Sequence, residues 1–406
     1  MKGKTSSPDQ ILGSPIKLPC GAVFKNRFAK SAMSDSLGNG NGDTNEEQVR
    51  LYERWSDGGA AVSFIGEVQV DPRFPEKPGN IVLGENTNEL TLKLLASRGQ
   101  VNGAQLWPQL GHAGALSHLP ISQPKGPSAL NIDGLQCAGM SLEDIQELPD
   151  MYARAATSAK RLGFGGVLLH AGHGFLLSQF LSPLFNHRTD GFGGSVDARC
   201  RIVLEIIDKI RCAVGPSYPV GIRINSTDQL GGGLSEVDAL EFVRLLHRTS
   251  IDLIDISGGT YFPGAKASSE GSTKGGPYFV EFARRAKKLT SIPLMASGGF
   301  KKREQALDAV ASGAVDMVGI GRAMVLNPRL ANDWLTNKGG DPEFPKFKSP
   351  PHGAITAWYT MRIAALAEDN EGKFALDLES ALRIYNERDE RRCNKWREKF
   401  FHLSAK

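Results

Sequence analysis

Eight short apolar segments constrain the fold of this chain more than any other feature of its sequence. They span 28–34, 60–70, 103–110, 166–172, 219–225, 252–259, 292–299 and 316–323. Most are almost continuously apolar rather than alternating in polarity, and each ends in small or polar residues. Strands of a parallel sheet, which are buried on both faces, have this pattern.

Segments with helical spacing lie between most of these strands. Helices are predicted over 141–162, 196–214, 235–246 and 301–311, and Ser141 with Asp144 can cap the first of them. Alternating strands and helices indicate βαβ units with right-handed crossovers. Eight such units in 406 residues favour an α/β chain that closes as one (β/α)8 TIM barrel.

The two ends of the chain predict additions to this barrel. Residues 16–24 predict a hairpin that caps the barrel floor, and the chain from Lys346 predicts a C-terminal helical extension with a break at Pro350 and Pro351. We therefore expect a barrel domain over 1–345 and a helical extension packed on it over 346–406. Residues 120–137, rich in Pro, Gly and Ser, predict a long loop at the barrel mouth.

Composition argues against several classes of protein. The net charge is +4 and the basic residues are scattered, so we expect no nucleic-acid partner. Five cysteines without a C-x-x-C pair predict reduced thiols. Neither a signal-peptide core nor an apolar run of about 18 residues is present. We therefore expect a cytoplasmic protein without a membrane partner.

The end of the fourth predicted strand carries the strongest candidate site. His170 and His173 are three residues apart with small residues between them. Two imidazole N–H groups could hold one carbonyl or nitro oxygen and stabilise negative charge that develops on it. The alternatives are two structural histidines or a zinc site, but no H-E-x-x-H motif or cysteine cluster supplies the further ligands that zinc needs.

Other strand ends predict binding functions. The seventh and eighth strands end in Ser297-Gly298-Gly299 and Gly321-Arg322, which could hold a phosphate or serve only as tight turns. Arg223, inside the fifth apolar run, predicts either a ligand contact or a core ion pair. The amide of Gln109, at the end of the third strand, could pair with the edge of a heterocycle.

Three motifs resemble the old yellow enzyme family of FMN-dependent ene-reductases. Residues 25–33 (KNRFAKSAM) resemble its first-strand motif, and 109–114 (QLGHAG) resemble its third-strand motif Q-L-x-H-x-G. Residues 170–194 resemble its long signature H-x-x-H-G-[YF]-L…FLSP…N-x-R-x-D-x-[YF]-G-G. The resemblance covers residues 16–330, most of the chain.

The resemblance implies FMN as cofactor, NAD(P)H as reductant and a small unsaturated molecule as substrate. It places His170 and His173 on the electron-withdrawing group of the substrate, and Ser34 near a flavin carbonyl. Gln109 would contact the pyrimidine edge of the flavin, and Arg223 would stabilise charge at its N1/O2 side. The implied FMN-binding residues are Ser31, Ala32, Met33, Ser34, Gly66, Gln109, His170, Arg223, Ser297, Gly298, Gly299, Gly321 and Arg322.

Two positions depart from the family pattern. Phe175 stands where the family usually carries the Tyr that protonates the substrate α-carbon, and phenylalanine has no exchangeable proton. Ala115 stands where many members have Arg. The proton would then come from water or from another side chain, of which Tyr261 is a candidate.

The resemblance implies reduction of an activated C=C bond, with hydride from NAD(P)H reaching the β-carbon by way of flavin N5. The absence of the Tyr donor also suggests a redox-neutral isomerase or a cyclisation-assisting enzyme of secondary metabolism. A non-catalytic or metal-hydrolase barrel is a third reading. The sequence leaves open the substrate, NADH against NADPH, and the oligomeric state, since the family often forms dimers or tetramers. Pocket shape would depend on the loops at 120–137 and 260–276.

Overall fold

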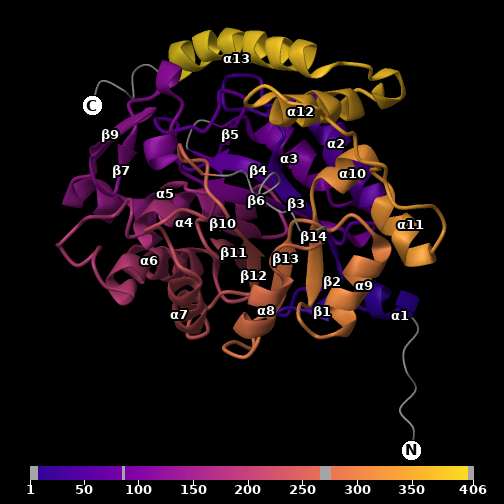
Figure 1. Cartoon of the computed structure of the whole chain (residues 1–406), viewed down its shortest axis with the longest axis horizontal. Helices are drawn as coiled ribbons and strands as arrows, with labels where there is room; N and C mark the ends of the chain where they lie inside the picture. Colours follow the sequence, from indigo (N-terminus) through magenta and orange to yellow (C-terminus); the bar gives the residue numbers. More distant parts are fainter. Residues whose placement is uncertain (1–7, 85–86, 266–275, 401–406) are drawn as a thin grey trace, which may run out of the picture.

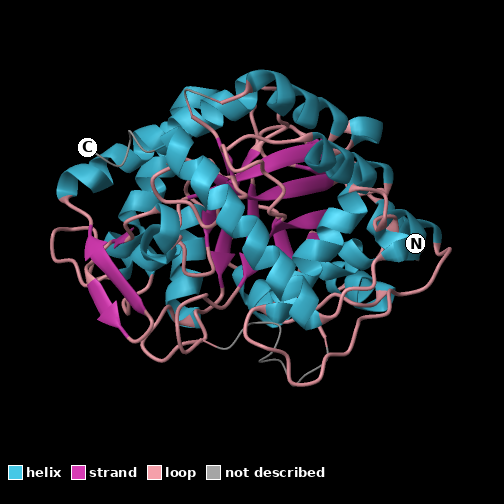
Figure 2. Ribbon diagram, turned by 90° about the horizontal axis from the view of Figure 1, so that it is seen from above, coloured by secondary structure: helices cyan, strands magenta, loops and turns pink. Residues whose placement is uncertain are grey.

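The computed structural model describes residues 8–84, 87–265 and 276–400. Its centre is a closed barrel of parallel strands, which Figure 2 shows surrounded by helices. The strands follow one another around the barrel, and pairing between β3 and β4 closes it. The barrel strands are β3 (Phe28–Ser34), β4 (Val62–Gln69), β6 (Gln105–Gly111), β10 (Val167–Ala171), β11 (Val220–Asn225), β12 (Leu253–Ser257), β13 (Leu294–Ser297) and β14 (Met317–Ile320).

All eight predicted strands are confirmed. Strand β3 has the predicted bounds, β6 begins two residues and ends one residue later than predicted, and the other six are shorter by up to three residues at one or both ends. The helices between them are α2 (Glu46–Asp57), α3 (Glu89–Arg98), α4 (Leu142–Arg161), α6 (Val196–Val214), α7 (Glu236–Leu246), α8 (Val280–Ala286) and α9 (Arg303–Ala311). Helices α10 (Arg322–Leu326) and α11 (Leu330–Thr336) follow the last strand, β14. Ser141 caps α4 through a capping box, because its hydroxyl accepts from Asp144 N while the Asp144 carboxylate accepts from Ser141 N. The cap predicted for this helix is therefore confirmed.

An apolar layer closes the floor of the barrel. After the short helix α1 (Pro8–Gly13), strands β1 (Ile16–Lys17) and β2 (Val23–Phe24) form the predicted hairpin. Phe24 reaches the fully buried Trp107, whose ring lies 5.4 Å from its own, and Phe64 packs on the other side at 5.7 Å. Because bulky side chains fill this end, the polar side chains of the interior lie toward the carboxyl ends of the strands.

Two further groups of elements flank the barrel mouth. The predicted loop at 120–137 contributes β7 (Lys125–Gly126), β8 (Leu130–Ile132) and β9 (Leu135–Gly139), which form a small separate sheet. Strand β5 (Ile81–Val82) adds to β4, and α5 (Leu176–Leu181) follows β10.

Within the ranges that the structure describes, no helix is long and apolar enough to cross a lipid bilayer.

The C-terminal helices α12 (Ala354–Ala367) and α13 (Leu378–Phe400) run along one edge of the molecule (Figure 1). Helix α13 is held to the loop after β4, because Trp396 donates from Nε1 to Pro72 O at 3.0 Å. Lys77 of the same loop lies 3.7 Å from the Asp389 carboxylate. The C-terminal helices thus fix the loop that carries Glu76 toward the barrel mouth.

Candidate active site

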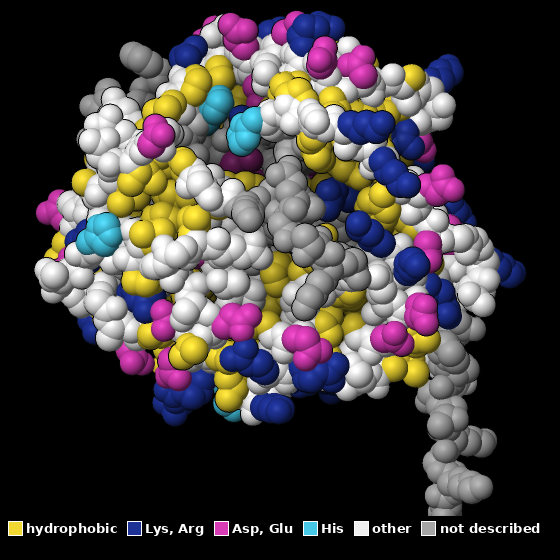
Figure 3. Space-filling model, viewed as in Figure 1, with side chains coloured by type: hydrophobic (Ala, Val, Ile, Leu, Met, Phe, Trp, Pro, Cys, Tyr) yellow, Lys and Arg dark blue, Asp and Glu magenta, His cyan; other side chains and the backbone are white. Residues whose placement is uncertain are grey.

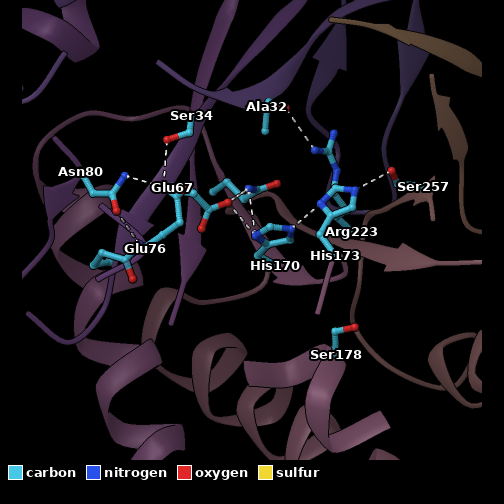
Figure 4. A network of polar contacts seen from close by, with 12 residues as sticks. Ala32, Ser34, Glu67, Glu76, Asn80, His170, His173, Ser178, Arg223 and Ser257 are labelled. Carbon is cyan, nitrogen blue, oxygen red and sulfur yellow. Dashed lines mark hydrogen bonds and ion pairs between the residues drawn. The ribbon is translucent and has the colours of Figure 1, made fainter. Parts of the chain in front are cut away.

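Three neighbouring strands bring a buried carboxyl, an amide and an imidazole together at the carboxyl end of the barrel (Figure 4). Glu67 Oε1 on β4 lies 2.7 Å from His170 Nδ1 on β10, and these side chains are 5% and 2% exposed. Gln109 of β6 donates from Nε2 to the same Glu67 oxygen at 2.6 Å. Burial, opposed by Arg223 and the Gln109 hydrogen bond, raises the pKa of Glu67 to about 8.

The contacts continue from His170 to His173 and Ser257. His170 Nε2 lies 3.0 Å from His173 Nδ1, and His173 Nε2 lies 2.8 Å from Ser257 Oγ at the end of β12. His173 has a left-handed backbone conformation (φ 59°) and its N–H donates to Asn225 Oδ1 at 3.0 Å. Burial first, and the positive charge of Arg223 as well, lower the pKa of both histidines well below the usual value. Both imidazoles are therefore neutral at neutral pH.

Arg223 of β11 forms a buried ion pair. Its guanidinium contacts Asp255 of β12, with Nε donating to Oδ2 at 2.6 Å, and Nη1 donates to Ala32 O at 3.3 Å. Ser297 donates to the other Asp255 oxygen at 2.7 Å and accepts from Ser31 at 2.9 Å. The core ion pair that the sequence allowed for Arg223 is thus present, and it lies at the mouth of the barrel beside the histidines.

Gly66 allows β3 and β4 to approach closely where their register shifts. A Cβ at Gly66 would lie 2.0 Å from Met33 O and 2.6 Å from Ser34 N, both of which are backbone atoms. No side-chain movement can relieve such a contact. The segment 31–34 therefore keeps its path along the barrel mouth only because residue 66 is glycine.

We expect Gly66→Ala to destabilise the protein by about 1–3 kcal/mol, because the added methyl must push the two strands apart. The variant should also retain less FMN after gel filtration. Thermal unfolding and the flavin absorbance per protein measure the two effects. Gly231→Ala, where an added Cβ meets nothing within 4 Å, is the control. Equal melting temperature and flavin content in Gly66→Ala and wild type would contradict this role.

A second protonatable carboxyl lies beside this group. Glu76 accepts from the Ser34 hydroxyl at 2.9 Å and from Asn80 Nδ2 at 3.2 Å. Burial, and next the nearby Glu67, raise the pKa of Glu76 to about 7. Two carboxyls that titrate near neutrality thus lie within one mouth, and Figure 4 shows both beside Ser34.

The residues expected to bind phosphate lie at the ends of β13 and β14. Gly298 and Gly299 have positive φ angles of 122° and 82°, and a Cβ at Gly299 would lie 2.2 Å from Gly276 O. Arg322 lies over the Tyr359 ring at 5.5 Å, and Gly321 precedes it at the start of α10. Lys and Arg side chains gather on this side of the molecule (Figure 3), where Figure 1 places α10 and α12.

Of the two departures from the family motifs, Phe175 lies beside His170 and Ala115 contacts Gln179 of α5. Phe175 is 4% exposed and its ring centre lies 4.8 Å from that of His170, so no hydroxyl occupies this position. Tyr261 is 69% exposed, with its ring 5.9 Å from that of His173. The Ala115 N–H donates to Gln179 Oε1 at 3.1 Å. Tyr261 is therefore the phenol nearest to the histidine pair among the contacts of the described residues.

These residues fit the pyrimidine part of a flavin. Gln109 Oε1 and Glu67 Oε2 are buried polar atoms without a hydrogen-bond partner. Buried polar groups are normally paired, so a planar heterocycle with N–H and C=O groups would supply what they lack. Glycine at 66 and 111 keeps the neighbouring backbone free of side chains; a Cβ at Gly111 would lie 2.6 Å from Glu67 Oε2.

Sequence reasoning missed Glu67, Glu76 and Asp255. Glu67 and Asp255 each lie inside an apolar run, in VSFIGEVQ and LIDIS. This is the signal that singled out Arg223, and it applies equally to both carboxyls. Glu76 lies in an irregular loop and carries no such signal.

The described residues contain no group of three or more His, Cys, Asp or Glu side chains that could hold a metal ion. The cysteines at positions 20, 137, 200, 212 and 393 are all free thiols.

Comparison with known proteins agrees with this arrangement. Residues 12–337 match the NADH:flavin oxidoreductase / NADH oxidase family. The NADH-dependent flavin oxidoreductase iliE of Hypocrea jecorina (strain QM6a) is 32% identical over 356 residues, which cover 80% of this chain and 88% of iliE.

Solved structures share the barrel. A 2-naphthoyl-CoA reductase complex has a TM-score of 0.76 at 27% identity over 81% of this chain, but the match covers only 53% of that longer chain. An old yellow enzyme homologue from Zymomonas mobilis has a TM-score of 0.72 at 20% identity, over 86% of this chain and 98% of its own. The barrel of this chain thus has the fold of an old yellow enzyme homologue. The chain belongs to the NADH:flavin oxidoreductase / NADH oxidase family and is an FMN-dependent NAD(P)H oxidoreductase.

Proposed function

We propose that the protein reduces an activated C=C bond, such as that of an α,β-unsaturated carbonyl compound. The observation that carries the proposal is the pair of neutral imidazoles, His170 and His173, whose facing nitrogens are 3.0 Å apart at the barrel mouth. When both rings carry the hydrogen on Nε2, the two Nε2–H groups could turn from His173 and Ser257 to one substrate oxygen. Such donors stabilise the negative charge that develops on a carbonyl oxygen when hydride reaches the β-carbon.

Bound FMN supplies the hydride, which it takes from NAD(P)H. Gln109 and Ser34 would hold the flavin edge, and Ser31, Ala32, Met33 and Gly66 would line its ring. Arg223 would stabilise negative charge at N1/O2, because Asp255 fixes its guanidinium from the opposite side. Ser297, Gly298, Gly299, Gly321 and Arg322 would hold the phosphate. One of these, Ser297, already donates its hydroxyl to Asp255, so its contribution would be the backbone N–H.

The positions of the histidines are fixed from several sides. Asn225 Oδ1 accepts from His173 N and Asn225 Nδ2 donates to Gly259 O at 2.8 Å, which ties the left-handed residue to two other loops. His170 is in contact with Glu67 and Gln109. Donors held in this way need little reorganisation when charge develops, which is the source of their catalytic effect.

An anaerobic assay with NADH or NADPH and cyclohex-2-enone tests the proposal. We expect one saturated ketone for each reduced nicotinamide consumed. The rates with the two nucleotides identify the physiological reductant. Oxidation of NAD(P)H only when oxygen is admitted, with no saturated product from any enone tested, would contradict the proposal.

A second candidate function follows from the phenyl ring of Phe175 beside His170. Without a phenol at this position, the α-carbon is not protonated by the enzyme in the usual way. The hydride could then return to the flavin after rotation about the bond between the α- and β-carbons, so that the configuration of the double bond changes without net reduction. This redox-neutral isomerase, or an enzyme that assists a cyclisation in secondary metabolism, remains within the same site.

We expect Phe175→Tyr to raise the ratio of reduced to isomerised product by about 10²-fold, the lower range for a general acid. Gas chromatography of the products from an α,β-unsaturated ketone of E configuration measures this ratio as saturated ketone to Z isomer. Phe175→Leu, which fills the space but supplies no proton, should leave the ratio unchanged. A ratio that does not differ between Phe175→Tyr and wild type would count against the isomerase.

We also propose that residues 346–406 form a helical extension packed on a barrel of residues 1–345. The extension holds the loop after β4 in the described part of the chain. A dimer or a tetramer would suit this arrangement, and light scattering distinguishes the two.

A further inference from the structure

Four side chains form an unbroken row of contacts across the barrel mouth (Figure 4). Glu67 Oε1 lies 2.7 Å from His170 Nδ1, His170 Nε2 lies 3.0 Å from His173 Nδ1, and His173 Nε2 lies 2.8 Å from Ser257 Oγ. Both nitrogens of each ring therefore make a contact within the row. Nδ1 faces the Glu67 end and Nε2 faces the Ser257 end. Glu67 is the group in this row whose pKa, about 8, lets it exchange a proton near neutral pH.

The neutral state of both rings couples their protons. Burial lowers the pKa of His170 and His173 far below the usual value, so each ring carries a single N–H. A neutral imidazole donates from one nitrogen and accepts at the other. Where two such rings face each other at hydrogen-bond distance, the tautomer of one fixes the tautomer of the other.

We propose that Glu67 is a positioning residue whose protonation decides which nitrogen of His170, and through it of His173, carries the hydrogen. With Glu67 protonated, its O–H donates to His170 Nδ1, His170 Nε2–H donates to His173, and His173 Nε2–H donates to Ser257. With Glu67 ionised, both rings carry the hydrogen on Nδ1 and the Ser257 hydroxyl donates to His173. The change releases one proton to solvent and moves one N–H on each ring.

The two states differ in what they offer a substrate, so this inference rests on the proposed function. In the protonated state both Nε2 atoms are donors and can turn to a carbonyl oxygen. In the ionised state both N–H groups point back along the row toward Glu67, and the Nε2 atoms can only accept. The ionised state therefore lacks the donors that an electron-withdrawing oxygen needs.

The surroundings of Glu67 raise the pH at which the two histidines change tautomer above neutrality. Burial is the largest cause that raises the pKa of Glu67 to about 8, and the charge of Arg223 opposes it. Glu76, Tyr152 and Tyr261 also face this carboxyl, because its charge contributes to raising the pKa of each of them. Because the folded protein holds the proton up to about pH 8, the donor state is present below that pH and is lost above it.

The backbone of Glu67 supports a role beyond packing. Its φ is 56°, in the left-handed region that residues other than glycine rarely adopt. Such a conformation persists only where the surrounding structure holds it, and it occurs often at functional sites. Here it directs the carboxyl inward to His170 and leaves Oε2 buried without a partner.

Nitrogen-15 NMR of the flavin-loaded protein labelled at histidine tests the proposal directly. The imidazole shifts identify the protonated nitrogen of each ring, and H170Q and H173Q variants assign the two rings. We expect both rings to carry the hydrogen on Nε2 at pH 6.5 and on Nδ1 at pH 9.5. Affinity for cyclohex-2-enone, measured by calorimetry, should fall about tenfold per pH unit above the transition.

Glu67→Gln removes the titrating proton but keeps the size and a donor. It should hold both rings in the Nε2–H form at either pH. Glu76→Gln, which removes the neighbouring carboxyl, should retain the transition. The same tautomer at both pH values in wild type, or an unchanged transition in Glu67→Gln, would overturn the proposal, and the wild-type series decides alone if the variant does not fold.

The same measurement separates this inference from the proposed function. A tautomer change with no reduction of any enone would leave the Glu67 assignment standing and reject the substrate class. Enone reduction without a tautomer change would support the substrate class and reject the Glu67 assignment.

Discussion

Replacing both His170 and His173 by alanine is expected to lower kcat/KM for an enone by about 10³-fold or more. Each imidazole donor removed from a developing oxyanion costs about 10²–10³ in rate, and the pair forms the candidate oxygen site. Binding of a phenol to the oxidised protein should be lost as well. Steady-state kinetics and the absorbance change on phenol binding measure the two effects.

The control for this variant uses two exposed histidines. Both are exposed, with His247 at the end of α7 and His352 just before α12. The double substitution His247→Ala, His352→Ala should leave kcat/KM within twofold of wild type. If the His170→Ala, His173→Ala variant bound a phenol and reduced an enone at the wild-type rate, the substrate site would have to lie elsewhere.

Asp255→Ala is expected to destabilise the flavin-free protein by about 3–5 kcal/mol, the usual effect of leaving one partner of a buried ion pair. Asp255 is fully buried and Arg223 is 3% exposed. Their removal from water is offset by their mutual contact and by the hydrogen bonds from Ser297 and to Ala32. Urea denaturation followed by circular dichroism measures the loss.

Two comparisons show whether the unpaired charge of Arg223 causes the loss of stability in Asp255→Ala. Glu281→Ala breaks an exposed ion pair with Arg284 at 3.5 Å and should change stability by less than about 1 kcal/mol. Asp255→Leu with Arg223→Met removes both charges and should be more stable than Asp255→Ala alone. An Asp255→Ala variant within 1 kcal/mol of wild type, on the same order as a surface pair, would contradict the structural role of this ion pair.

The fold was accessible from the sequence because its strands are buried on both faces. Runs such as 166–169 and 292–296 are almost continuously apolar, and glycines such as Gly172 and Gly298 mark the turns after them. The trimmed ends have a simple cause: residues such as Ala60 and Gly259 are apolar or small but lie beyond the last ladder hydrogen bonds. The cap of α4 was accessible for a different reason: Ser141 and Asp144 are close in sequence and interact locally.

The site was only partly accessible, because its contacts are made between strands. The motif 170–173 predicts two histidines at one strand end, but it does not say that Glu67, more than a hundred residues earlier, contacts the first of them. The left-handed conformation of Glu67 coincides with the register shift between β4 and β6, where β4 carries an extra residue between Ile65 and Val68. Likewise, the charge of Arg223 required a partner, but its identity as Asp255 follows from strand register.

A single turnover of the reduced enzyme tests the central claim most directly. The protein is reduced with one equivalent of NAD(P)H without oxygen, separated from excess nucleotide, and mixed with cyclohex-2-enone in a stopped-flow spectrophotometer. The flavin absorbance should return to its oxidised level as one saturated ketone forms, and the His170→Ala, His173→Ala variant should stay reduced on the same timescale. Reoxidation that is equally fast in that variant, or a wild-type flavin that stays reduced until oxygen is admitted, would contradict the account.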